Sequence, residues 1–247
     1  MIVGIACEDR GHFDAVTYLV DGALLREHDW LDGIIDSCRS WRGLDETERW
    51  YKYDRRDAHD LRPLVLEDGS RISRHGRIRG EVLEPEASMW RKVLMLFCHR
   101  TPRPELVLLV RDMDGYDDRK DGMLQVRDGI SWPFGIVIAA PGPEIEAWYV
   151  AGFVPRDEQE HRALAQQRAA LSFDPTLASH RLTSHPNDAA KDAKRVLEAL
   201  CGSNVERRHR CLDDPGLLRE RGVGNGAAAF LDEVQVEVLP RMGMPRK

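Results

Sequence analysis

Two aspartates separated by one residue follow a run of five apolar residues. The run occupies residues 106–110, and Asp112 and Asp114 come just after it. Such a run is typical of a strand buried on both faces, and side chains at positions i and i+2 of an extended segment point to the same side. Carboxylate oxygens are the protein ligands that hard divalent cations prefer. We therefore predict a Mg²⁺ or Mn²⁺ site at the end of this strand.

Three further acidic residues stand at equivalent places along the chain. Glu8 follows a predicted strand over residues 2–7, and Glu144 and Glu146 follow another over residues 134–140. The carboxyl ends of parallel strands converge on one crevice, so we expect all five acids to be neighbours in the folded chain. Five carboxylates in one place repel one another unless cations neutralise them, which favours bound metal ions.

Helical patterns alternate with these strands. Apolar spacing predicts helices over residues 13–25, 84–99, 144–152, 157–171, 187–200 and 226–239. The residues between the second and third strands are interpreted as an acidic loop. This order predicts an α/β fold with a central, mostly parallel sheet, covering helices and a C-terminal helical portion. We expect a domain over residues 1–152 with an insertion at about 30–80, and a helical extension over 153–247 packed on the same core.

The acidic pattern resembles the TOPRIM domain, a metal-binding α/β module shared by topoisomerases, primases and OLD-type nucleases. Its glutamate after the first strand is matched by Glu8, and its Asp-x-Asp by residues 112–114. Residues 143–148, Pro-Glu-Ile-Glu-Ala-Trp, are similar to an acidic region of small stand-alone TOPRIM proteins related to OLD nucleases. Those nucleases usually carry a second acid four residues after the glutamate, where this chain has His12, with Asp14 two residues later.

The resemblance implies metal-dependent cleavage of phosphodiester bonds. In such chemistry two ions about 3.5 to 4 Å apart activate a water and stabilise the leaving oxygen. On the family pattern, the first ion would be held by Glu8, Asp112 and Asp114. The second would be held by Glu144 or Glu146 together with His12 or Asp14.

A lysine near the scissile phosphate completes the OLD-type pattern. Lys191 and Lys194 are the candidates, near the start of the helix predicted over 187–200, and Lys191 is slightly preferred. The resemblance thus implies a Mg²⁺- or Mn²⁺-dependent endonuclease acting on DNA more than RNA, in defence against phage or other foreign nucleic acid. Such proteins often work beside an ATPase. This chain has no G-x-x-x-x-G-K-[ST] motif, so a partner would supply ATP hydrolysis.

Composition sets outer limits on the function. The 247 residues carry a formal net charge of −6, which argues against coating DNA through the global field of the protein. No apolar run approaches the roughly 20 residues of a membrane span, and the N-terminus lacks the features of a signal peptide. The five cysteines form no C-x-x-C pair. We expect a cytoplasmic protein without membrane contact, whose partners are nucleic acid, an ATPase and further copies of itself in a homo-oligomer.

Each candidate residue also has a plainer interpretation. Aspartates after a strand often occupy a solvated turn, and Asp9 beside Glu8 is placed to cap the first helix. Glutamates in the first turn of a helix are favoured by its dipole, and the lysines suit a solvated helix face. The basic residues 71–79 fit either a solvated hairpin or a ribbon that meets a phosphate backbone. A regulatory subunit without turnover, or an enzyme of free nucleotides, remains an alternative to the nuclease.

Overall fold

A five-stranded sheet forms the centre of this computed structural model. Its strands are β1 (Ile2–Cys7), β2 (Ser40–Arg42), β3 (Tyr51–Lys52), β8 (Leu106–Val110) and β9 (Gly135–Ala139). The order across the sheet is β2, β1, β8, β9, and β3 pairs with the end of β1 beyond β2. Every pairing is parallel. The predicted α/β fold with a mostly parallel sheet is confirmed.

The structure describes residues 1–45, 47–52, 64–65, 71–72, 77–78, 80–84, 86–184 and 190–243. Most of the basic segment 71–79 and the first residues of the helix predicted over 187–200 lie outside this set. Two small antiparallel ladders are described between β3 and the next helix. They pair β4 (Leu64–Val65) with β5 (Arg71–Ile72), and β6 (Arg77–Ile78) with β7 (Glu81–Val82).

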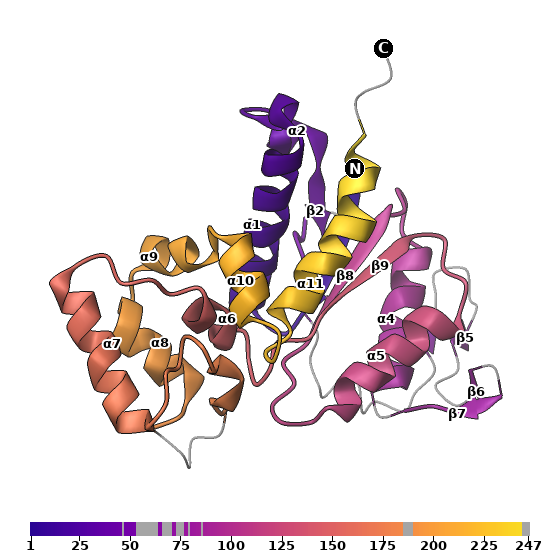
Figure 1. Ribbon diagram of the computed structural model, residues 1–247. Coiled ribbons are helices and arrows are strands. Elements are labelled where there is room, and N and C mark those ends of the chain that lie inside the picture. Colours follow the sequence, from indigo (N-terminus) through magenta and orange to yellow (C-terminus); the bar gives the residue numbers. More distant parts are fainter. Residues whose placement is uncertain are drawn as a thin grey trace.

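Helices cover both faces of the sheet because successive strand residues point to opposite sides. One face, with Ile5, Leu108 and Val137, packs against α1 (Arg10–Glu27), α6 (Glu146–Ala151) and α11 (Ala227–Glu233). The other face, with Leu109 and Ile138, packs against α4 (Ala87–Cys98) and α5 (Asp118–Gly129). Figure 1 shows α1 and α11 on one side of the strands and α4 and α5 on the other. The result is a three-layer arrangement.

The C-terminal helices belong to the same core as the sheet. Phe230 and Leu231 of α11, and Val234 and Val238 of the following π-helical turn η4 (Val234–Val238), share one apolar cluster with Val3. At the left of Figure 1 lie α7 (Glu158–Leu171) and α8 (Ala193–Cys201), where α8 contacts α6, and residues of both helices belong to the same cluster. No helix within the described residues is long and apolar enough to cross a bilayer.

Short segments complete the chain. They are η1 (Asp29–Leu31), α2 (Ile35–Cys38), η2 (Ser179–Arg181), α9 (Val205–His209), η3 (Arg210–Leu212), α10 (Pro215–Arg221) and η5 (Leu239–Met242).

Two expectations about the elements need correction. The acidic loop expected after β8 contains the 12-residue helix α5, which buries Arg119, Met123 and Val126 along one side. Part of the expected insertion is also sheet, because β2 and β3 fall within residues 30–80 and pair with β1.

Candidate metal centre

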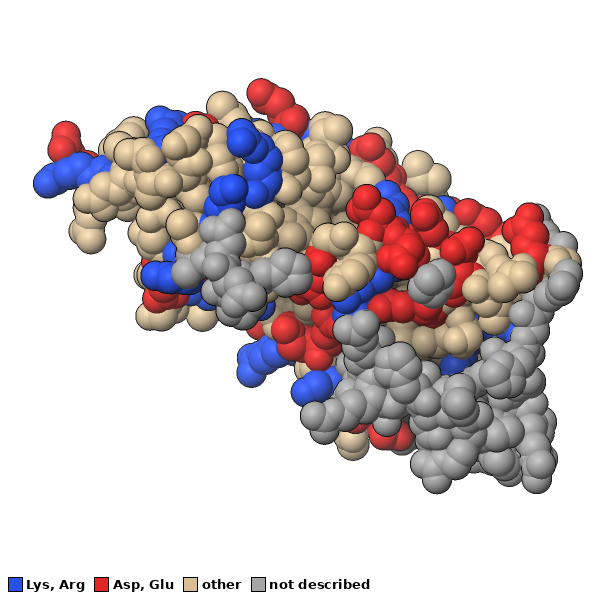
Figure 2. All heavy atoms as spheres, turned by 90° about the horizontal axis from the view of Figure 1, so that it is seen from below, with Lys and Arg blue, Asp and Glu red and all other residues tan. Residues whose placement is uncertain are grey.

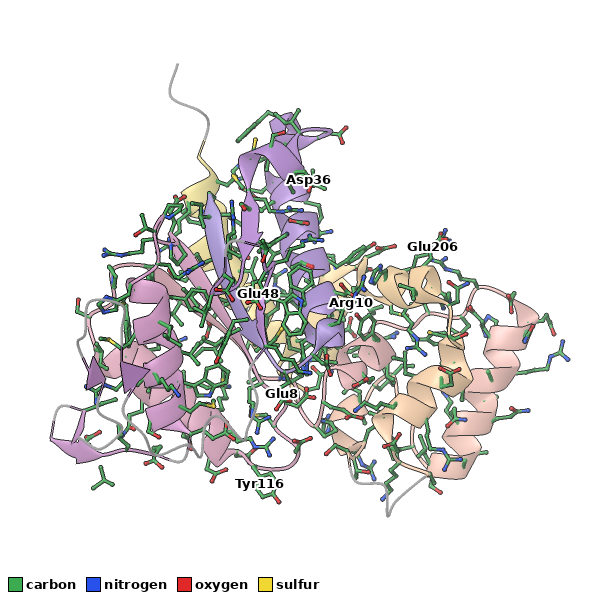
Figure 3. The ribbon with its side chains drawn as sticks, turned by 180° about the vertical axis from the view of Figure 1, so that it is seen from behind. Glu8, Arg10, Asp36, Glu48, Tyr116 and Glu206 are labelled. Atoms are coloured by element: carbon green, nitrogen blue, oxygen red, sulfur yellow. The ribbon has the colours of Figure 1, made fainter. Side chains whose placement is uncertain are left out.

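Three side chains from distant parts of the sequence meet at the carboxyl ends of the strands. Glu8 follows β1, His12 lies in the first turn of α1, and Asp112 lies just beyond β8. One ligand atom from each lies within 4.8 Å of the others, the only such group of three in the described part of the chain. Because β1 and β8 are parallel neighbours, their ends bring Glu8 and Asp112 together. Glu8 lies at the lower edge of the sheet in Figure 3.

Asp9 holds the His12 ring in place through its Nδ1 atom. Asp9 is the N-cap of α1, and its Oδ1 accepts a hydrogen bond from His12 N and contacts His12 Nδ1, both at 3.0 Å. A carboxylate behind Nδ1 fixes the tautomer whose Nε2 carries a lone pair, as in carboxylate–histidine–metal arrangements. His12 is 1% exposed. Its Nε2 therefore faces the interior of the acidic group rather than solvent.

The free face of His12 fits a metal ligand. Nε2 lies 2.8 Å from Asp112 Oδ1, yet the contact lacks hydrogen-bond geometry, and Nε2 has no other hydrogen-bond partner among the described residues. Buried polar atoms normally have a hydrogen-bond partner. Because His12 Nε2 lacks a well-oriented one and lies beside two carboxylates, it could coordinate a metal ion. One nitrogen and two carboxylate groups are a suitable donor set for a divalent ion such as Mn²⁺.

Neighbouring carboxylates shift the pKa of His12, and His12 shifts the pKa of Asp9. Burial lowers the pKa of His12, but the contacts with Asp112 and Asp9 outweigh it and raise that pKa to about 10. The hydrogen bond from His12 holds the pKa of the Asp9 carboxyl well below its usual range. Coordination of a metal ion through Nε2 requires the neutral form of the ring.

Two buried arginines, which the sequence analysis did not identify, lie among the acids. Arg111, between β8 and Asp112, contacts Glu8 and donates from Nη2 and Nε to the two carboxylate oxygens of Glu86, at 2.9 and 3.1 Å. Arg119 of α5 donates from Nη1 to Asp114 Oδ2 at 2.5 Å and to the Asp112 carbonyl at 2.7 Å. The sequence offered one indication of the role of Arg111, because this charged residue directly follows the apolar strand and precedes Asp112.

Asp114 is not a member of the group of three. Its φ of 49° lies in the left-handed region, and its N–H donates to the Pro143 carbonyl at 2.8 Å. The side chain bonds to Arg119. Asp14, an alternative ligand for a second ion, pairs with Arg10 at 3.4 Å. Within the described residues the structure therefore does not assemble the two sets of ligands that the resemblance implies.

Glu144 and Glu146 lie beside the group of three. Asp112 Oδ1 accepts a hydrogen bond from Ile145 N at 2.9 Å, which fastens the start of α6 to the end of β8. Glu144 is 2% exposed, and its Oε2 is 2.8 Å from Lys194 Nζ. Burial raises the pKa of Glu144, and burial together with the charge of Glu144 raises the pKa of Glu146 to about 7.

The structure pairs Lys194 with one of the predicted acids, Glu144. α8 begins at Ala193 because Asp192 caps it by accepting a hydrogen bond from Arg195 N at 2.8 Å. Lys194 therefore lies in the first helical turn, whereas Lys191 precedes the helix and its carbonyl accepts a hydrogen bond from Thr183 N. The Lys194 side chain is 61% exposed and remains accessible to an anion.

No known family model, curated protein or solved structure matches this chain. The TOPRIM resemblance accordingly rests on the sequence motifs alone. The geometry adds what those motifs lack, namely a buried histidine at the position where the family pattern has an acid.

The surface around the site is acidic. Figure 2 looks at the lower side of the molecule and shows Asp and Glu side chains gathered there with Lys and Arg among them. Asp118 and Asp121 in the first turn of α5 are both exposed. A phosphate backbone approaching this side would be repelled unless cations lie between the two surfaces.

Proposed function

We propose that this protein is a divalent-metal-dependent endonuclease that hydrolyses phosphodiester bonds in DNA, and less readily in RNA. One observation carries the proposal. Glu8, His12 and Asp112 offer one nitrogen and two carboxylate groups within 4.8 Å of one another, with the orphaned Nε2 of a buried histidine among them. The position of this group at the carboxyl ends of parallel strands, where α/β folds bind ligands, supports it further.

The residues have separable roles in this proposal. A divalent ion at the site would act as a Lewis acid toward a phosphoryl oxygen and lower the pKa of a water. Glu8, His12 and Asp112 would hold it, and Asp9 would orient the His12 ring. Lys194 pairs with Glu144 and is accessible to solvent, so it is the cation of α8 best placed to meet a substrate phosphate.

A role in defence against foreign nucleic acid is part of the proposal and is supported by the TOPRIM resemblance. Proteins of the OLD-related kind often work with an ATPase, and the chain has no P-loop motif of its own. We therefore propose an ATPase as partner. The cleavage experiment should accordingly be run with and without the ATPase encoded nearest to this gene, where there is one.

Plasmid cleavage tests the proposal directly. Supercoiled DNA is incubated with the intact chain and Mn²⁺, Mg²⁺ or EDTA, and nicked and linear products are measured. Asp112→Asn should abolish cleavage, since it removes a ligand charge and keeps the acceptor for Ile145 N. Asp118→Asn, an exposed acid in the first turn of α5, is the matched control and should cleave like the unaltered chain. Equal cleavage by both variants would contradict the proposal.

A second function is favoured by one observation, the pairing of the acids with fixed cations. Arg111, Arg119 and Lys194 already neutralise Glu8, Asp114 and Glu144. A regulatory subunit that holds a metal ion for structural reasons would have the same arrangement. It predicts metal binding without cleavage of plasmid or RNA, with or without the ATPase. Turnover of mononucleotides with polymers left intact would instead indicate an enzyme of free nucleotides.

A further inference from the structure

We propose that the site holds a single divalent ion and that the fixed positive charges of Arg111 and Arg119 pair with Glu8 and Asp114, two of the acids that the family pattern assigns to metal ions. The inference rests on the proposed function and specifies its metal requirement. It also makes Asp114 a partner of Arg119 rather than a metal ligand.

The first argument is the number of complete ligand sets. Among the described residues, only Glu8, His12 and Asp112 bring three ligand atoms within 4.8 Å of one another. A cluster of acids alone would not identify a metal site. Here the buried His12 supplies an independent sign, because its Nε2 points into the cluster and lies 2.8 Å from Asp112 Oδ1 in a contact that lacks hydrogen-bond geometry. Asp114 and Glu144 are outside this group and are bonded to other side chains.

The second argument is the position of Arg111. Its side chain is 2% exposed and contacts both Glu8 and Glu86. Arginine stays protonated in proteins, so its guanidinium brings a fixed positive charge to the site. A second dication beside this group would meet a fixed positive charge in a site from which water is largely excluded, where repulsion is strong.

The third argument is the double contact of Arg119. Nη1 bonds to the Asp114 carboxylate and to the Asp112 carbonyl, so it bridges the two aspartates that the family pattern assigns to metal. Its guanidinium also lies over the ring of Tyr116, 4.8 Å from the centroid. Tyr116 and Glu8 both lie near the lower edge of the ribbon in Figure 3. A metal ion bound to Asp114 would have to compete with Arg119 for the Asp114 carboxylate.

Titration with Mn²⁺ tests the inference without relying on activity. The intact chain is titrated by calorimetry, and free Mn²⁺ is followed by electron paramagnetic resonance. Both are repeated with a phosphorothioate DNA duplex, because a second ion sometimes binds only with substrate. We expect one Mn²⁺ per chain in each case. Glu8→Gln should weaken binding at least about tenfold, whereas Asp114→Asn should leave both affinity and stoichiometry unchanged within about twofold.

Variants are compared only after circular dichroism shows that they fold. If Glu8→Gln does not fold, His12→Gln replaces it, with the same expected loss. Two Mn²⁺ per chain, or the loss of an ion in Asp114→Asn, would overturn the single-ion inference while leaving a metal-dependent nuclease intact. Absence of any Mn²⁺ binding to the folded chain would overturn the proposed function as well. The two failures are therefore distinguishable.

Discussion

Asp9 offers the sharpest test of how the site is built, because one side chain supports both a helix and a ligand. Its Oδ1 accepts the backbone N–H of His12 and contacts the ring Nδ1, both at 3.0 Å. Asp9→Ala removes both contacts. Loss of an N-cap costs about 1 kcal/mol, and a buried ring N–H left without an acceptor costs about 1 to 3 kcal/mol more. We expect the free energy of unfolding to fall by about 2 to 4 kcal/mol.

The same substitution should weaken metal binding through the histidine. Residues behind a metal ligand typically contribute about 10- to 100-fold in affinity. The matched control is Asp157→Ala, which removes the N-cap of α7, where Asp157 accepts a hydrogen bond from Glu160 N at 2.8 Å. It should cost about 1 kcal/mol and leave Mn²⁺ affinity unchanged.

Urea unfolding and Mn²⁺ calorimetry on the two variants separate these effects. A variant that retains the cap, Asp9→Asn, should keep most of the stability and still lose metal affinity, since Asn is as good an N-cap as Asp but lacks the charge. The reasoning is refuted if Asp9→Ala and Asp157→Ala lose similar stability and bind Mn²⁺ with the same affinity.

Three further outcomes follow from the structure. Burial and a neighbouring carboxylate raise the pKa of Glu146 from 4.5 to about 7. Only the folded state holds this proton between those values, so unfolding free energy should fall as pH rises through that window and level off above it. Glu146→Gln should therefore be more stable at pH 8 by up to about 3 kcal/mol and unchanged at pH 4, by urea unfolding. Arg207→Ala breaks a largely buried pair with Glu160 and should cost about 2 to 4 kcal/mol in thermal unfolding, whereas Arg162→Ala at an exposed pair should cost under about 0.5 kcal/mol. Glu233→Ala removes the side-chain acceptor of a β9 backbone N–H and should speed hydrogen exchange of that amide, whereas Glu233→Gln keeps an acceptor and should not.

The strands and their convergence were predictable from sequence. The strands over residues 2–7 and 106–110 have the predicted bounds. In β8 every residue is apolar and buried, which made the strand easy to recognise from the sequence. Parallel pairing of β1 with β8 then accounts for the meeting of Glu8 with Asp112. The metal-binding role of these residues stays a prediction.

The rest depends on contacts that local patterns do not encode. The residues of α5 were interpreted as a loop because most of them are charged or polar and few are apolar. One of its buried positions is occupied by Arg119, which pairs with Asp114. Glu86 reaches Arg111 from the start of α4, a pairing that no sequence spacing marks. β2 and β3 are too short to show the apolar–polar alternation of a strand. They are strands because their backbones pair with β1, whose edge would otherwise have unpaired N–H and C=O groups.

The way α11 and η4 share a core with β1 has a consequence for synthesis on the ribosome. Phe230 and Val234 belong to the same cluster as Val3, so β1 is synthesised well before some of the side chains that cover it. Until those residues leave the ribosome, the nascent chain exposes an apolar surface of the sheet to which other molecules can bind.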